Sequence, residues 1–150
     1  MHHVARIWHP CHAAQRKAFR LRCLTMIGAW LLDTCVLSEV VKALPNGGVL
    51  QWLAQHQGQG CISVVTIAEL SFGVNRLPQG RRRNQLQQWL GDIRTGFSDR
   101  ILPTDEAVWI HFASLKADLL TKGKAQDDLD LLIAATAQTH GLTLVTRNTR

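Results

Sequence analysis

From Met26 onward, short apolar runs alternate with segments whose apolar residues recur every three or four positions. The runs at 27–33, 61–65, 101–102 and 142–146 are rich in Ile, Leu and Val and predict strands. The segments between them have the spacing of amphipathic helices. Strands that alternate with helices are typical of a parallel sheet flanked by helices, so the pattern predicts an α/β domain with a short, mainly parallel sheet.

Local signals place the ends of several helices. Thr34 is expected to cap a helix that ends near the 44–48 breaker, and Thr66 with Glu69 has the T-x-x-E spacing of a capping box. Gly141 follows the last expected helix in the usual cap position. Helices are therefore expected at 34–44, around 49–53, and at 66–77, 81–93, 105–122 and 127–140.

Length and composition indicate one packed domain. The chain has 150 residues, of which 46% are hydrophobic. Charges or glycines interrupt its apolar stretches well before the roughly 20 residues that span a bilayer, so no membrane segment is expected. The cysteines show no C-x-x-C spacing, which argues against a disulfide framework or a zinc site and favours a cytoplasmic location.

The net charge of +6 is concentrated at the N-terminus. Residues 1–25 contain five Arg and Lys and no acidic residue, so residues 26–150 carry only one of the six net positive charges. The segment lacks the apolar core of a secretory signal, although an Arg-rich, acid-free stretch could mimic an organellar transit peptide. We interpret residues 1–25 as an extension upstream of the true start at Met26.

Three acidic residues, Asp33, Glu69 and Asp130, each lie where an apolar segment meets a polar one. Asp33 closes the first predicted strand, and ligands collect outside the carboxyl ends of parallel strands. Glu69 is expected in the first turn of the helix that follows the next strand. Asp130 shares a helical face with Ile133 and Ala137, so burial of that face brings its carboxylate to the edge of the core.

Each acid also has a local explanation. Asp33 could cap its own helix, Glu69 could belong to a capping box, and Asp130 could favour the helix dipole. No Lys or Arg stands near any of the three in sequence, which favours a metal ion over an ion pair, although distant residues could supply one. Hard oxygen ligands of this kind select Mg²⁺ or Mn²⁺.

Four segments, LLDTCVLSE, SVVTIAELSFGV, ILPTDEAV and DLLIAATAQTHGLTLVTRN, follow one another in the order of the motifs of PIN-domain ribonucleases. Over residues 28–150 the chain resembles this family, and within it the VapC toxins of type II toxin–antitoxin modules, including their FitB-like members. The resemblance implies a three-layer PIN-like fold in which Asp33, Glu69 and Asp130 are catalytic and bind Mg²⁺ or Mn²⁺. It also implies hydrolysis of RNA phosphodiester bonds, a cognate VapB-like antitoxin and a homodimer.

The chain departs from the family pattern at two positions. Asn148 stands where members often carry a fourth acid, and its neutral side chain is a weaker metal ligand. Cys35 stands where Asn is usual, and its thiol is expected to be packed rather than coordinating. Thr146 could orient the attacking water or a ligand, or could be only a strand-end residue. Because the chain stops at Arg150, before an expected final strand, we interpret residues 26–150 as a C-terminally truncated PIN domain.

Two functions remain open from the sequence. The leading interpretation is a metal-dependent endoribonuclease toxin, which the three acids favour. The alternative is a catalytically impaired remnant that binds partners without cleaving RNA, which Asn148 and the end at Arg150 favour.

Several surfaces could serve the implied partners. Arg81–Arg83 is the clearest basic run of the domain and could contact RNA, or could simply be a solvated helix start. Trp52, Trp89 and Trp109 fall on apolar helical faces and are expected in the core or at interfaces rather than stacked on bases. The apolar helices around 49–53 and 86–93 could form a groove for the antitoxin or for a second copy of the chain.

Overall fold

The computed structural model describes residues 30–148. The interpretations of residues 1–25, of a start at Met26 and of the end at Arg150 lie outside this range. Four parallel strands form one sheet in the order β3-β2-β1-β4. The strands are β1 (Trp30–Leu32), β2 (Gly60–Ser63), β3 (Ile101–Leu102) and β4 (Thr143–Val145).

Successive residues of each strand point to opposite faces of the sheet, as a period of two requires. Leu31 and Cys61 belong to a core on one face, together with Val108 of α6. Leu32 and Ile62 belong to a second core on the other face. The sheet is thus buried on both sides, which explains why its strands read as continuous apolar runs rather than alternating ones.

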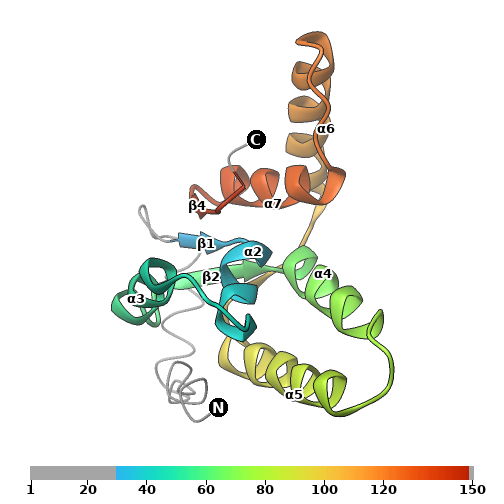
Figure 1. Cartoon of the computed structure of the whole chain (residues 1–150). Coiled ribbons are helices and arrows are strands. Elements are labelled where there is room, and N and C mark those ends of the chain that lie inside the picture. The colour runs from blue at the N-terminus through green and yellow to red at the C-terminus, as the bar shows by residue number, and fades with distance from the viewer. Residues whose placement is uncertain (1–29, 149–150) are drawn as a thin grey trace.

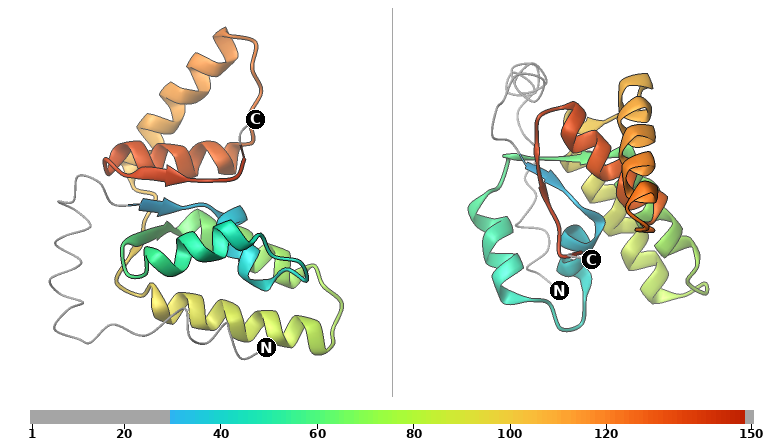
Figure 2. Two further views of the ribbon diagram at one scale, coloured as in Figure 1. Left: turned by 60° about the vertical axis from the view of Figure 1, so that its left-hand side comes forward. Right: turned by 90° about the horizontal axis from the view of Figure 1, so that it is seen from above.

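Helices cover both faces of the sheet, which makes three layers (Figure 1). Helices α6 and α7 lie on one side, and the remaining helices gather on the other (Figure 2). The helical elements are α2 (Thr34–Leu37), the 3₁₀ helix η2 (Ser38–Val41), α3 (Gly47–Gln55), α4 (Val64–Asn75), α5 (Arg81–Gly96), α6 (Glu106–Thr121) and α7 (Asp128–Thr139). The predicted three-layer α/β architecture is confirmed.

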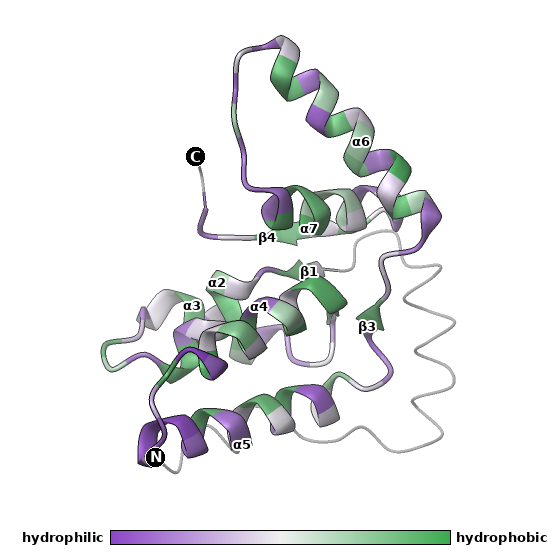
Figure 3. Ribbon diagram, turned by 90° about the vertical axis from the view of Figure 1, so that its right-hand side faces the viewer, coloured by the Kyte–Doolittle hydropathy of each residue, from purple (hydrophilic) through white to green (hydrophobic). Residues whose placement is uncertain are grey.

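Helix α6 projects from the body of the domain and packs chiefly against α7 (Figure 2). Of its residues only Val108 is buried, whereas Trp109, Ile110 and Leu120 are exposed. Apolar and polar residues accordingly mix along its length (Figure 3). In residues 30–148, no helix is both long and apolar enough to cross a membrane.

The helix after β1 begins with one of the two caps that the sequence offered, Asp33 rather than Thr34. Its N-cap is Asp33, whose carboxylate accepts a hydrogen bond from the N–H of Thr34, so Thr34 is the first helical residue rather than the cap. Asp is an equally strong N-cap and stands one position earlier. The predicted helix at 34–44 is also shorter, because α2 ends at Leu37 and tightens into η2.

The predicted capping box of Thr66 and Glu69 is wrong. Helix α4 begins at Val64, earlier than expected, because Ser63 is its cap and accepts from the N–H of Val65. Thr66 is fully buried within the helix, and Glu69 lies in the second turn rather than the first. Glu69 therefore does not take part in capping α4. The β-branched residues Val64 and Val65, expected in the strand, belong to this helix.

Candidate metal centre and active site

Asp33 follows the last residue of β1, which is one of the two inner strands. It therefore lies at the carboxyl edge of the sheet. It is only 6% exposed. One carboxylate oxygen accepts from the N–H of Thr34 at 2.6 Å. The other accepts from the hydroxyl of Thr146 at 2.5 Å and from the thiol of Cys35 at 3.0 Å. These donors fix the carboxylate in one orientation.

The segment after β4 crosses the same edge of the sheet. Thr146 donates to Asp33, and its hydroxyl oxygen accepts from the N–H of Asn148 at 2.9 Å. The side-chain amide of Asn148 donates to Oδ2 of Asp130 at 2.8 Å. Asn148 therefore connects the end of β4 to the first turn of α7.

Glu69 joins the arrangement through a hydroxyl. Its Oε2 accepts from Oγ1 of Thr34 at 2.5 Å, while the backbone N–H of Thr34 donates to Asp33. A continuous series of hydrogen bonds thus runs from Glu69 through Thr34, Asp33, Thr146 and Asn148 to Asp130. The structure places all three sequence-predicted acids, and both supporting residues, in this one series.

The charges of these acids act on one another. Burial raises the pKa of Glu69, and the nearby charges of Asp33, Asp130 and Asp127 raise it further, against the lowering effect of the Thr34 hydroxyl. Burial likewise raises the pKa of Asp130, and Asp33 and Asp127 add to the rise. Desolvation is the larger cause, and repulsion among like charges adds to it. The cluster is thus an electronegative site that a cation would stabilise.

A pocket of about 200 Å³ opens beside these residues. Asp33, Asp130, Thr146 and Asn148 line it, together with Gln126 and apolar side chains of α7. Glu69 does not line the pocket and is connected to Asp33, which does, by the two hydrogen bonds of Thr34. Within residues 30–148, no three His, Cys, Asp or Glu side chains stand as a ready-made group that could hold a metal ion.

The donor set nevertheless suits a hard divalent cation. The pocket offers two carboxylates, two side-chain amides and a hydroxyl, all of which carry oxygen donors. Two cations near the site, Arg147 and Lys42, both pair with Glu39, at 2.6 and 2.7 Å. The sequence argument that Lys and Arg do not neutralise the acids agrees with these pairings.

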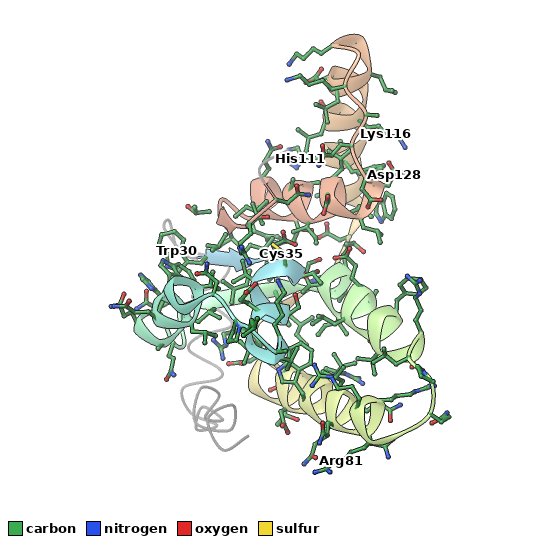
Figure 4. The ribbon with its side chains drawn as sticks, viewed as in Figure 1. Trp30, Cys35, Arg81, His111, Lys116 and Asp128 are labelled. Atoms are coloured by element: carbon green, nitrogen blue, oxygen red, sulfur yellow. The ribbon has the colours of Figure 1, made fainter. Side chains whose placement is uncertain are left out.

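Cys35 has a larger part in the site than the sequence suggested. Its half-buried thiol contacts Asp33, lies 3.5 Å from the hydroxyl of Thr146 and accepts from the N–H of Arg147 at 3.1 Å. Figure 4 shows it at the start of α2, facing the layer of α7. Burial raises its pKa, so the thiol keeps the proton that it donates to Asp33. In the sequence, the position of Cys35 two residues after Asp33 is the signal that could have indicated this role.

The aromatic residues of the opposite sheet end stand apart from this site. Trp30, at the start of β1, packs edge-on against Trp52 and His56, which stack on each other with centroids 4.2 Å apart. Trp89 is buried, as predicted. These rings therefore contribute to packing at the end of the sheet away from Asp33.

A parallel sheet between helical layers, with acidic side chains gathered at its carboxyl edge, defines an α/β domain with a candidate cation site. The chain belongs to the PIN domain family, whose model matches residues 30–150. It is 40% identical over 121 residues to the VapC ribonuclease Y4jK of Sinorhizobium fredii, an alignment that covers 79% of this chain and 86% of the relative.

Two further comparisons concern Neisseria gonorrhoeae. The chain is 40% identical to its toxin FitB over 121 residues, covering 79% of this chain and 87% of FitB. The crystal structure of FitAcB from the same organism superposes with a TM-score of 0.75 at 40% identity, covering 80% of this chain and 88% of that one. The resemblance to PIN-domain VapC proteins seen in the sequence motifs is confirmed.

Proposed function

We propose that this protein is a metal-dependent endoribonuclease, the toxin of a toxin–antitoxin module, which hydrolyses phosphodiester bonds in RNA. The observation that carries the proposal is the convergence of Asp33, Glu69 and Asp130 at the carboxyl edge of the sheet, where their charges repel one another and the nearby cations pair with Glu39. A relative named a ribonuclease and another named a toxin, each 40% identical, support it.

In this proposal Asp33 and Asp130 hold a Mg²⁺ or Mn²⁺ ion directly. Glu69 is the third acidic residue of the metal centre. A divalent cation, when bound, supplies polarisation of a phosphate oxygen and lowers the pKa of water. Thr34 orients the carboxylate of Glu69, and Thr146 orients that of Asp33. Asn148 positions Asp130 from the opposite side. These second contacts matter because ligand orientation tunes metal affinity.

The proposal includes the partners implied by the family resemblance. A VapB-like antitoxin would neutralise the toxin, and RNA would be its substrate. A homodimer stays a prediction, and the exposed apolar side chains of α6, among them Ile110 and Leu120, are compatible with it. An RNA-cleaving toxin acts where cellular RNA is found, so we expect a cytoplasmic location.

The decisive experiment is cleavage of labelled RNA by the full chain with Mg²⁺, with Mn²⁺ or with EDTA. We expect cleavage with either ion and none with EDTA. Asp33→Asn should abolish cleavage yet keep the melting temperature within a few degrees, because Asn caps a helix as well as Asp. Asp92→Asn, an exposed change on α5, is the matched control and should cleave like the parent.

If the unmodified chain is well folded but leaves RNA intact with Mg²⁺ and with Mn²⁺, the endoribonuclease proposal is rejected. The catalytically impaired remnant is then favoured. Nothing in residues 30–148, nor in the comparisons, favours that alternative. Asn148 favoured that alternative in the sequence. In the structure it donates a hydrogen bond to Asp130 and can position that carboxylate.

A further inference from the structure

A shallow basin of about 760 Å³ adjoins the acidic pocket. Gln126 and Asn148 line both cavities, so the basin continues directly from the candidate metal centre. Its rim carries two cationic side chains, Lys42 from the end of η2 and Arg147 from the segment after β4. These residues lie 105 positions apart in the chain, and only the fold brings them together.

A buried carboxylate holds the two cations in place. Glu39 is 2% exposed, and its Oε2 lies 2.7 Å from Nζ of Lys42 and 2.6 Å from Nη1 of Arg147. Its Oε1 accepts from the N–H of Asn46 at 2.8 Å. The hydrogen bond from Lys42 is the largest cause that lowers the pKa of Glu39 to about 2, so the anchor stays ionised at neutral pH.

The anchored cations still face solvent. The side chains of Lys42 and Arg147 are 48% and 44% exposed. An ammonium has three donors and a guanidinium five, and each gives one to Oε2 of Glu39. Lys42, Arg147 and Glu39 together carry a net charge of +1, beside the negative charge of Asp127 in the same basin. Donors thus remain for an anion in the basin.

RNA needs such a surface here, because Asp33, Glu69, Asp130 and Asp127 repel its phosphates. We infer that Lys42 and Arg147 bind backbone phosphates of the RNA strand next to the scissile one, and that Glu39 is the positioning residue that holds both cations. This inference rests on the proposed function and deepens it. Asp127, which also lines the basin, repels the strand toward the two cations.

The basic run that begins at Arg81, labelled in Figure 4, opens α5 and does not line the basin. Arg82 donates to the carbonyl of Val41 at 2.6 Å, and Arg83 donates to the carbonyl of Leu77 at 3.2 Å. Both guanidinium groups therefore tie α5 to neighbouring backbone. Neither Arg82 nor Arg83 lines the basin.

The test measures binding of a fluorescein-labelled, mixed-sequence single-stranded RNA of about 12 nucleotides to the full chain by anisotropy, at several salt concentrations. All variants carry Asp33→Asn, which prevents cleavage during the titration. Lys42→Gln and Arg147→Gln should each raise Kd by roughly three- to tenfold and lower the magnitude of the salt slope by about 0.7. Arg94→Gln, an exposed change on α5, should bind like its parent.

Lys42→Arg distinguishes charge from packing, because it keeps the cation and its bond to Glu39; it should bind RNA within twofold of the parent. If Lys42→Gln and Arg147→Gln match Arg94→Gln, or if Lys42→Arg binds as poorly as Lys42→Gln, the inference is overturned. Cleavage by the chain without Asp33→Asn is measured in parallel. Its absence would reject the proposed function, whereas cleavage with unchanged Kd in the glutamine variants would reject only the phosphate surface.

Discussion

Two glutamates near the carboxyl edge of the sheet have pKa values shifted in opposite directions. Glu39 is buried among donors, and Lys42, the N–H of Asn46 and Arg147 lower its pKa to about 2. Glu69 is half-buried among acids, and burial together with Asp33 and Asp130 raises its pKa. The first carboxylate is satisfied by the protein itself, and the second is not. Among the described residues no cation pairs with Glu69, which agrees with the metal site proposed for the acidic set.

Removal of an acid from the uncompensated set should have the largest effect. Asp130→Asn should reduce RNA cleavage by at least about a hundredfold, because the pocket loses one of its two charged oxygen donors. The rate is measured under single-turnover conditions. Asp128→Asn, two residues earlier on α7 and paired with Lys116 on the surface, is the control and should stay within twofold. Equal losses of cleavage rate in the two variants would contradict the special role of Asp130.

Removal of the compensated carboxylate should instead affect stability. Glu39→Gln should lower the melting temperature at pH 7 by several degrees, because Lys42 and Arg147 lose their buried partner. A depressed pKa stabilises the fold above the unfolded value of 4.5, and this contribution is lost as the pH falls toward about 2. The difference between the parent and Glu39→Gln in thermal unfolding should therefore shrink over that range. A pH-independent difference would contradict this assignment.

Metal addition should sharpen the comparison further. Mg²⁺ at about ten times its Kd should stabilise the parent by about 1.4 kcal/mol, a rise of a few degrees in melting temperature. Asp33→Asn should lose this rise, whereas Glu39→Gln should keep it on a lower baseline. Calorimetry of the three proteins with and without Mg²⁺ measures both effects. A rise that disappears in Glu39→Gln but persists in Asp33→Asn would reverse the proposed roles.

The smallest effect is expected at Cys35. Cys35→Ala removes a donor to Asp33 and should slow cleavage severalfold, while the Thr34 and Thr146 donors still hold the carboxylate. Cys35→Ser keeps a donor and should recover most of the rate. Single-turnover cleavage of the two variants is compared with the parent. An alanine variant as fast as the parent would show that the thiol only packs.

Much of the architecture was predictable because it depends on local and periodic signals. The apolar runs locate all four strands to within a few residues, and Asp105 and Gly141 act as the start and stop signals expected of them. The predictions failed where two local signals competed. Ser63 and Asp33 cap their helices in place of Thr66 and Thr34, because several nearby residues can each serve as an N-cap for a different helix start, and tertiary packing selects one.

The site was predictable in its residues but not in its connections. Asp33, Glu69 and Asp130 were identified by position and by family motif, and the structure brings them into one series of hydrogen bonds. The link from Thr34 to Glu69 could not be read from the sequence, because it spans 35 residues. The same holds for Cys35 and Arg147, whose contact joins segments 112 residues apart.

The sequence by itself determined the fold class, the strand and helix order and the identity of the acids, because periodicity, turn residues and motif order are properties of neighbouring positions. Only the tertiary structure decided which charges neutralise one another. It pairs Lys42 and Arg147 with Glu39 and leaves Asp33, Glu69 and Asp130 to repel each other. The physical reason is that electrostatic energy depends on distance and burial in space, and neither is encoded in the spacing of charges along the chain.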